Sequence, residues 1–268
     1  MSDPESYEIF AVKYGSMVEN RFRRDNFILA DDHAAPMPID YYVWAIRNEN
    51  RTLVVDAGFD YAEAEKRGRK VDRLPRDGLE ILGIDAATVE DVIITHMHYD
   101  HAGTLDDFPA ARFHVQDAEM QFATGRHMCQ QPFAMAFTCD HVVGMVRRVF
   151  EGRVVFHDGD EEIAPGITVH KVGGHTMGMM FVRVLTKRGW VVLASDSTHF
   201  YENLEATKPF PIVYSVADMI SGYDKIKAHA ESGSHIIPGH DPLVLARYPA
   251  LNSATEGIIG RLDVDPKG

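Results

Sequence analysis

Three histidines and an aspartate lie within six residues of this chain, and no other feature constrains its fold as strongly. Residues 95–101 read Thr-His-Met-His-Tyr-Asp-His and follow a Val-Ile-Ile run that predicts a buried strand. Imidazole and carboxylate groups are good ligands for divalent cations such as zinc. In an extended segment His96 and His98 share one face, whereas Asp100 and His101 turn toward a second position. The segment therefore predicts a loop at a strand end that can serve two metal ions.

Further candidate ligands follow other predicted strands. Residues 173–175 read Gly-Gly-His, and the glycines let the backbone bring the His175 imidazole close to a crowded site. Asp196 ends an apolar strand pattern, where a carboxylate is costly unless it is paired or metal-bound. His240 follows Pro-Gly after the last strand pattern. Strand ends are where layered α/β proteins usually keep their chemistry, so these residues extend the candidate site.

Strand and helix patterns alternate along the whole chain, which predicts a layered α/β fold. Helices are expected in parts of 60–88, broken by Pro75 and several glycines, and over 117–148, interrupted by Pro132. Residues 15–40 predict an irregular arm. Strands are expected at residues 7–12, 41–47, 52–56, 89–95, 112–115, 153–157, 167–172, 179–185, 190–195 and 235–238, with 41–47 and 52–56 joined as a hairpin.

The clearest helix pattern spans residues 215–230. Ser215 and Asp218 resemble a capping box at its start. Apolar residues at helical spacing predict one buried face, made of Val216, Met219, Ile220, Tyr223 and Ile226.

Charge and composition exclude several classes of protein. The 40 acidic residues outnumber the 27 basic ones, and the formal net charge of −13 repels phosphate backbones and anionic lipid. We therefore expect no nucleic-acid partner and no membrane partner. No apolar run is long enough to span a bilayer, and the first residues lack a basic and apolar leader. Cys129 and Cys139 fit reduced thiols, so a cytoplasmic location is expected.

Taken in order, the motifs resemble the metallo-β-lactamase superfamily. They are His-x-His-x-Asp-His, a Gly-His loop, a strand-end Asp and a Pro-Gly-His, and residues 55–58 resemble the early Asp-x-Gly turn of that family. The resemblance covers most of the chain. It implies a single hydrolase domain over residues 1–268, folded as a four-layer αβ/βα sandwich with a dinuclear metal site along one edge.

The resemblance also implies how the candidate ligands divide between two divalent ions. The first metal would be bound by His96, His98 and His175. The second would be bound by Asp100, His101 and His240, with Asp196 bridging the two. Zinc is the first choice for both ions, and Mn, Fe and Co suit the same ligands.

Within the superfamily the chain most resembles the N-acyl homoserine lactonase-like branch, through its N-terminal arm, its length and its helical insertion. True β-lactamases carry a cysteine at the position of Asp196, and flavodiiron proteins carry a glutamate at that of His98. RNA-processing members need a basic arm, which fits poorly with a charge of −13. Glyoxalase-type thioesterases share all seven ligands and stay open as an alternative, as do phosphodiesterases of the same fold.

The helical insertion near residues 117–150 predicts a lid over an apolar substrate, or simply a packed helical pair. Its large apolar residues are Met120, Phe122, Met128, Phe133, Met135 and Phe137. By resemblance, the N-terminal arm is expected to support a homodimer.

The resemblance implies a quorum-quenching hydrolase that opens a lactone or ester through a metal-bridging hydroxide. Asp100 would orient this nucleophile and shuttle its proton to the leaving group. Lactonases of this branch carry a substrate-binding tyrosine three residues after the bridging aspartate, where this chain has His199. We expect His199 to donate that hydrogen bond, or Tyr201 to replace it.

Overall fold

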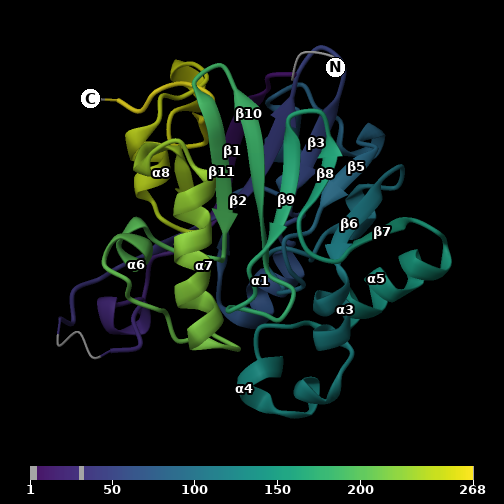
Figure 1. The fold of residues 1–268 in the computed structure, drawn as a ribbon, viewed down its shortest axis with the longest axis vertical. Coiled ribbons are helices and arrows are strands. Elements are labelled where there is room, and N and C mark those ends of the chain that lie inside the picture. Colours follow the sequence, from purple (N-terminus) through teal and green to yellow (C-terminus); the bar gives the residue numbers. More distant parts are fainter. Residues whose placement is uncertain (1–4, 30–32, 268) are drawn as a thin grey trace.

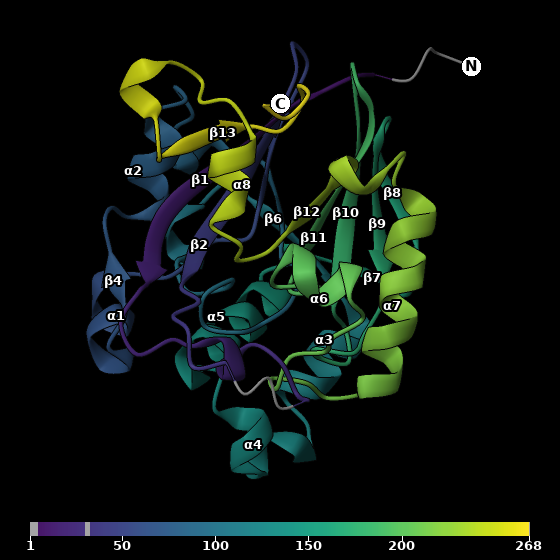
Figure 2. The ribbon, with the colours of Figure 1, turned by 90° about the vertical axis from the view of Figure 1, so that its left-hand side faces the viewer.

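Two β-sheets pack face to face, with helices over both outer faces (Figures 1 and 2). The computed structural model describes residues 5–29 and 33–267. In the first sheet the strand order is β13 (Ile259–Arg261), β1 (Glu8–Met17), β2 (Ile39–Arg47), β3 (Thr52–Val55), β5 (Asp91–Ile93), β6 (Arg112–Gln116) and β7 (Val154–His157), with β4 (Lys70–Val71) beside β1. In the second sheet it is β12 (Ile236–Pro238), β11 (Gly189–Ser195), β10 (Met180–Thr186), β9 (Ile167–Lys171) and β8 (Glu161–Ala164).

The first sheet changes from antiparallel to parallel pairing at β3, so the carboxyl ends of β3 and β5 lie at the same edge. In the second sheet β11 and β12 are parallel, and their carboxyl ends also lie together. These four strand ends position the candidate site described below.

The helices lie between the strands in the chain. They are α1 (Tyr61–Arg67), α2 (Pro75–Glu80), α3 (Asp117–Ala123), α4 (Gln131–Ala134), α5 (Cys139–Phe150), α6 (Tyr201–Glu205), α7 (Val216–His229) and α8 (Leu243–Arg247). In Figure 2, α7 covers the outer face of the second sheet, and α1 and α2 lie on the opposite side of the molecule.

Alternating side chains divide the core into layers, because successive residues of a strand point to opposite faces. On β1, Ile9 and Ala11 pack between the two sheets, whereas Phe10 and Val12 face the helices that cover the first sheet. The outer face of the second sheet packs against α7 in a third cluster. This helix–sheet–sheet–helix arrangement is the four-layer αβ/βα sandwich that the sequence predicted.

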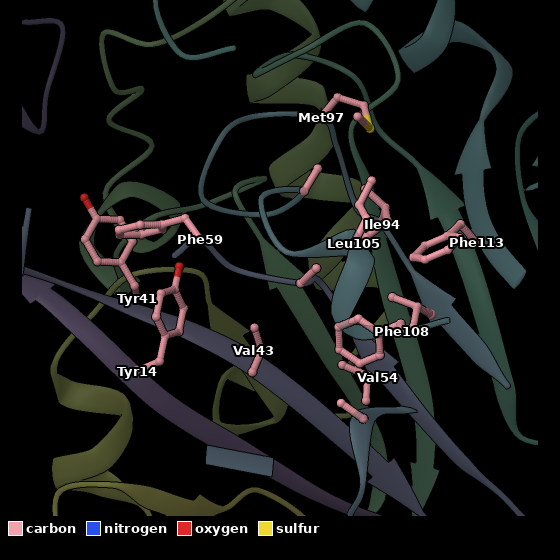
Figure 3. Close-up of a cluster of buried hydrophobic side chains, with 14 of the residues drawn as sticks. Tyr14, Tyr41, Val43, Val54, Phe59, Ile94, Met97, Leu105, Phe108 and Phe113 are labelled. Carbon is pink, nitrogen blue, oxygen red and sulfur yellow. The ribbon is translucent and has the colours of Figure 1, made fainter. Parts of the chain in front are cut away.

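An aromatic group supports the loop after β5. Tyr14 and Tyr41 both pack edge-on against Phe59, with ring centroids 5.3 and 4.9 Å apart (Figure 3). The Tyr14 hydroxyl donates a hydrogen bond of 3.0 Å to the backbone oxygen of Asp100. The buried core therefore fixes the backbone of the predicted metal loop.

Several details differ from the sequence predictions. On α7 the Ser215 side chain accepts a hydrogen bond from the Asp218 backbone, as expected of an N-cap. Val216 and Ile220, however, are 41% and 38% exposed, so only Met219, Tyr223 and Ile226 form the buried face. The prediction counted every apolar residue near the stripe, but α7 contacts one flat sheet, which covers a narrower arc of the helix.

The two prolines begin helices and do not break them. Pro75 is the first residue of α2, and Pro132 lies in the first turn of α4, where a missing backbone N–H costs nothing. The expected irregular arm is shorter than residues 15–40, because β1 continues to Met17 and β2 begins at Ile39; residues 30–32 of that arm lie outside the described part. The elements β4, β8, β13, α6 and α8 were missed because they are short.

Among the described residues, no helix is both long and apolar enough to cross a membrane.

Candidate metal centre

The candidate ligands come from both sheets and meet at one edge. His96, His98, Asp100 and His101 follow β5, and Asp196 follows β11. His240 follows β12, and His175 lies in the loop between β9 and β10. All seven side chains are buried, although their strands are far apart in the sequence.

Asp196 is the centre of this group. Its Oδ2 lies 3.3 Å from His175 Nε2 and 3.9 Å from His96 Nε2. Its Oδ1 lies 3.4 Å from His101 Nε2 and 3.1 Å from His240 Nε2. One carboxylate therefore faces both predicted ligand sets, and His240 Nε2 is about equally close to its two oxygens, at 3.1 and 3.2 Å.

The structure brings the members of each predicted ligand set together, and His96 and His101, from different sets, also group with Asp196. His96, His98 and His175 offer ligand atoms within 4.8 Å of one another. Asp100, His101 and His240 form a second such group. The assignment of these residues as metal ligands remains a prediction.

Four buried polar atoms at the centre have no hydrogen-bond partner in the described structure: His96 Nε2, His101 Nε2, His175 Nε2 and Asp196 Oδ1. Leaving a buried polar atom unpaired costs about 1–3 kcal/mol. Because these atoms point at one another, divalent cations between them would satisfy all four at once. The residues present therefore fit a metal centre.

In three of the candidate ligands the other ring nitrogen, Nδ1, has a hydrogen-bond partner outside the centre. His101 Nδ1 lies 2.7 Å from Asp56 Oδ2, and His175 Nδ1 lies 2.7 Å from a backbone oxygen, that of Ile212. His240 Nδ1 is equally close to the backbone oxygen of Asp40. A donor Nδ1–H leaves the lone pair on Nε2, which is the nitrogen that faces the centre, and such partners orient imidazole ligands in metal sites.

Asp56 joins the two sheets beneath the ligands. Its carboxylate accepts hydrogen bonds from the Thr95 backbone and hydroxyl, and from the Ser195 hydroxyl at 3.3 Å. Asp56 and Ser195 have φ of 63° and 45°, in the strained left-handed region. The early Asp-x-Gly turn of the sequence therefore supports the centre through His101.

A positioning residue that the sequence analysis missed is Glu119 at the start of α3. Its buried carboxylate accepts hydrogen bonds from Met97 N at 2.8 Å, Thr176 Oγ1 at 2.6 Å and Gly178 N at 3.1 Å. It therefore ties the loop after β5 to the loop that carries His175. Glutamate is common in the first turn of a helix, so no local sequence signal distinguishes this buried glutamate from an exposed one.

Glycine allows the last loop to approach the centre. A Cβ on Gly239 would lie 2.6 Å from Asp196 Oδ1 and 2.8 Å from the Ser195 backbone. Any side chain there would displace the carboxylate or the strand end. The glycine of the Pro-Gly-His motif therefore lets the backbone come close enough for the next residue, His240, to reach the centre.

Burial and neighbouring charges set the protonation of the centre. Burial lowers the pKa of His96 and His98 well below the usual value, which keeps both imidazoles neutral. The pKa of Asp196 lies well below its usual range, because His240 and His101 outweigh the opposing effect of burial. Neutral imidazoles and an ionised carboxylate are the forms that bind metal, and His96, His98 and Asp196 are in those forms. Burial lowers the pKa of His101 and His240, but the nearby carboxylates, Asp196 foremost, outweigh burial and raise both, so these two imidazoles would release a proton on binding metal.

His199 and Tyr201, the two candidates for the carbonyl donor, lie in different surroundings. His199 Nε2 is 2.9 Å from Asp196 Oδ2, and its ring stacks on Phe210 at 3.6 Å. Tyr201 packs in the core between the sheets, with the Arg247 guanidinium 3.9 Å from its ring. His199 therefore lies at the centre, and the alternative that Tyr201 replaces it is not supported.

A pocket opens onto this centre. It is bounded by ligands, including His98, Asp100 and His240, and by the side chains of His199 and Met135. Of the apolar insertion residues, Phe122 and Phe137 are buried core residues, whereas Met135 is 53% exposed. The Phe137 ring packs on His98 with centroids 4.6 Å apart. The insertion is thus mainly a packed helical cap whose Met135 reaches the pocket.

Another set of ligand-type side chains lies on the second sheet: Asp160, His170 and His229. There the Lys225 ammonium is 2.6 Å from Asp160 Oδ1, so the carboxylate already has a cation partner.

The fold and the site together define a class of protein: a two-sheet αβ/βα sandwich with buried histidine and aspartate side chains where the sheet edges meet. The sequence profile of the metallo-beta-lactamase superfamily matches residues 38–254, and the chain belongs to that superfamily.

Among curated proteins, the chain is similar to the N-acyl homoserine lactonase AttM of Rhizobium johnstonii, at 27% identity over 64% of this chain and 65% of that protein. It is 28% identical to the N-acyl homoserine lactonase AiiB of Agrobacterium fabrum, over 67% of this chain and 65% of that protein. A probable metallo-hydrolase of Mycobacterium tuberculosis is 22% identical over 78% of this chain and 75% of its own length. The chain thus spans about 65% of the length of the lactonases it matches.

Solved structures share the fold. A quorum-quenching N-acyl homoserine lactone lactonase superposes with a TM-score of 0.72 and 18% identity, covering 89% of this chain and 94% of that one. An N-acyl homoserine lactone hydrolase with N-hexanoyl-L-homoserine at its catalytic metal centre gives a TM-score of 0.70 and 17% identity, covering 89% and 94%.

Proposed function

We propose that this protein is a dinuclear-metal hydrolase that opens the ring of a lactone, an N-acyl homoserine lactone or a related lactone or ester. One observation carries the proposal: buried imidazole and carboxylate atoms without partners converge around Asp196 at the bottom of a pocket. The lactonase names of the relatives favour a carboxylic ester bond over the thioester and phosphodiester alternatives.

The two ligand sets would hold two divalent cations, with zinc the first choice. When bound, such ions supply a water nucleophile at neutral pH and polarise the carbonyl that is attacked.

Asp100 is proposed as the proton carrier. Its carboxylate lines the pocket, with Oδ2 3.7 Å from His240 Nε2 and Oδ1 3.8 Å from His101 Nε2. The attacking water oxygen bonds to the carbonyl carbon, and the ring C–O bond then breaks. Asp100 accepts the proton of the water and delivers it to the leaving oxygen, so that a hydroxy acid is released.

His199 is proposed as the donor to the substrate carbonyl. Burial lowers its pKa to about 3, so at neutral pH the imidazole is uncharged and carries a single N–H. Its Nε2 lies 2.9 Å from Asp196 Oδ2, and the proposal is that an N–H on this nitrogen turns from the carboxylate to the substrate carbonyl when Asp196 binds metal. A neutral donor can stabilise the developing oxyanion without repelling nearby cations.

The test is hydrolysis of a substrate panel with metal content measured on the same preparation. The panel contains short and long N-acyl homoserine lactones, simple γ- and δ-lactones, one thioester and one aryl phosphodiester. Two metal ions per chain with selective ring opening is the expected result. Two metal ions with turnover of only the thioester or the phosphodiester would refute the lactonase proposal and keep the metal centre.

A further inference from the structure

Arginines line the pocket above the candidate metal centre, in a chain whose net charge is −13. Arg21 comes from the N-terminal arm, and Arg67 and Arg69 come from the end of α1 and the residues after it. Basic residues are fewer than acidic residues in this protein. We therefore ask, for each of the three arginines in this pocket, which group interacts with its positive charge.

Arg67 has a structural reason. Its guanidinium bonds to the Glu63 carboxylate and donates to the backbone oxygen of Met135 at 2.9 Å and the Thr138 hydroxyl at 3.0 Å. It also lies 3.9 Å from the Tyr99 ring. Arg67 therefore ties α1 to the helical insertion, and its charge is paired.

Arg21 and Arg69 have no such partner. Arg21 donates from Nε to the Asn26 side-chain oxygen at 2.9 Å. Arg69 donates from Nε to the Tyr99 hydroxyl at 3.3 Å and from Nη1 to the Arg67 backbone oxygen at 2.9 Å. Neither guanidinium forms an ion pair with a carboxylate of residues 5–29 or 33–267, and both Arg21 Nη groups and Arg69 Nη2 lack a hydrogen-bond partner there.

The two unpaired guanidinium groups act on each other. Burial lowers the pKa of Arg21, Tyr41 and the Asp25 carboxylate oppose that effect, and the nearby positive charge of Arg69 adds to it. Both are only half-buried, so their unpaired N–H groups are open to a ligand. Two guanidinium groups that line one pocket and form no direct ion pair within residues 5–29 and 33–267 are suited to bind one oxyanion through charge-assisted hydrogen bonds.

The geometry points to a substrate that carries an oxyanion group, a carboxylate or a phosphate, away from the bond that is hydrolysed. Arg21 and Arg69 bind that group while the carbonyl reaches the floor of the same pocket; this rests on the proposed hydrolase function. An unsubstituted N-acyl homoserine lactone has no charged group and would leave both guanidiniums unpaired. The inferred substrate class is therefore an anionic lactone or ester.

A chain of contacts from Arg69 through Tyr99 and Tyr41 to His240 runs along the pocket lining. The Tyr99 hydroxyl, which accepts from Arg69, lies 3.0 Å from the Tyr41 hydroxyl, and the Tyr41 ring packs on His240 at 5.4 Å. The chain fixes the position of Arg69 relative to the ligand set around His240. A substrate is thus held at a set distance between its anionic group and its carbonyl.

The test compares matched lactones with the metal-loaded enzyme. One lactone carries a free carboxylate, a second carries the corresponding methyl ester, and a third carries a phosphate in the same place. The variants are R21M, R69M and R69Q, and R112M is the matched control, because Arg112 is an exposed arginine outside the pocket. The readout is the ratio of kcat/KM for each anionic lactone to that for the methyl ester.

Wild-type enzyme and R112M are expected to prefer an anionic lactone by at least about tenfold. Each pocket variant should reduce that ratio by about ten- to a hundredfold, mainly through KM. The carboxylate and phosphate arms show which oxyanion the pair prefers. A ratio near one in the wild type, or a ratio unchanged in R21M, R69M and R69Q, would overturn the inference.

A binding measurement separates this inference from the proposed function. Isothermal titration of metal-free protein with each anionic lactone, and with its methyl ester, should show binding of the anion that R69Q and R21M weaken and R112M does not. If the metal-loaded enzyme opens no lactone but this binding is seen, the hydrolase proposal fails and the oxyanion site stands. If lactones are opened but no anion binding is seen, the hydrolase proposal stands and the oxyanion site is refuted.

Discussion

At the scale of single residues, we expect Asp196 to determine whether the candidate centre can hold metal. It faces both ligand sets, and its Oδ1 is buried without a hydrogen bond. Asp196→Asn keeps the shape but replaces a charged ligand by an amide, and His101→Ala removes one imidazole of the second set. We expect each variant to lose at least one metal ion per chain together with most of its activity, because each substitution removes a proposed metal ligand.

Metal analysis by mass spectrometry and the lactone assay check this on the same preparations. His235→Ala is the matched control, since His235 lies at the opposite end of β12 from His240. A fully metallated and fully active Asp196→Asn or His101→Ala protein would contradict the assignment.

His199 provides a second test, because it lies beside the centre without belonging to either proposed ligand set. His199→Phe should keep the ring stacked on Phe210 and remove the N–H that faces Asp196. We expect kcat to fall by about 10²–10³-fold, the cost of one oxyanion donor, with the metal content unchanged. Loss of metal would instead make His199 a ligand, since it groups with His175 and Asp196.

At the scale of elements, α3 joins two of the metal-centre loops through Glu119. Burial raises the pKa of Glu119, although the three hydrogen bonds to its carboxylate oppose that effect. In Glu119→Gln an amide NH₂ would face donor groups, so we expect a loss of about 2–3 kcal/mol in the free energy of unfolding. Metal affinity should fall about 10–100-fold, because the loops lose their shared support.

Urea unfolding of the metal-free protein and a zinc titration measure the two effects. Glu65→Gln, an exposed substitution on α1, is the control. Equal stability of Glu119→Gln and wild-type protein would show that the carboxylate does not hold the loops.

The N-terminal arm is fastened to α6 by an ion pair with a defined pH dependence. Arg23 donates to Glu202 at 2.7 and 2.9 Å, and Lys208 lies 3.0 Å away. The hydrogen bond from Arg23 lowers the pKa of Glu202, and Lys208 adds to this against the effect of burial. A lowered folded-state pKa means that this stabilisation is present above the unfolded value of about 4.3 and is lost as the pH falls through the folded value.

Glu202→Gln should therefore be less stable than wild type by up to about 1 kcal/mol at pH 7, with the difference vanishing toward pH ~3. Thermal melts of both proteins between these pH values measure it. Glu205→Gln, on the exposed face of the same helix, is the control. A stability difference between wild type and Glu202→Gln that grows as the pH falls would contradict the ion pair as its cause.

At the scale of the whole molecule, metal should connect the two sheets, because each of them contributes ligands. Ions that bind only the folded state stabilise it by about 4 kcal/mol when their free concentration is a thousand times Kd. Chelation should then lower the Tm by roughly 8–16 °C for a domain of this size. Differential scanning calorimetry before chelation, after chelation and after zinc is returned checks this. No shift in a preparation shown to contain metal would contradict it, and Asp196→Asn should show a smaller shift.

The sequence by itself determined the elements that local patterns encode. Buried strand runs followed by His, Asp or Gly-His mark the strand ends, because side-chain period and ligand chemistry are local properties of a chain. Local patterns therefore predicted a layered α/β fold and the set of ligand-type residues, whereas the division of that set into two groups around Asp196 was implied by the family resemblance. The strands β2, β3 and β5 and the helix α7 lie close to their predicted positions for the same reason.

Only the tertiary structure decided properties that depend on contacts between distant segments. It exposed Val216 and Ile220, placed Tyr201 in the core and His199 at the centre, and buried Glu119 between two loops. It also brought Arg21 and Arg69 to one pocket, with no direct ion pair to a carboxylate of the described residues. Burial and charge pairing are properties of surroundings, and folding assembles the surroundings of each residue from parts of the chain that sequence patterns treat separately.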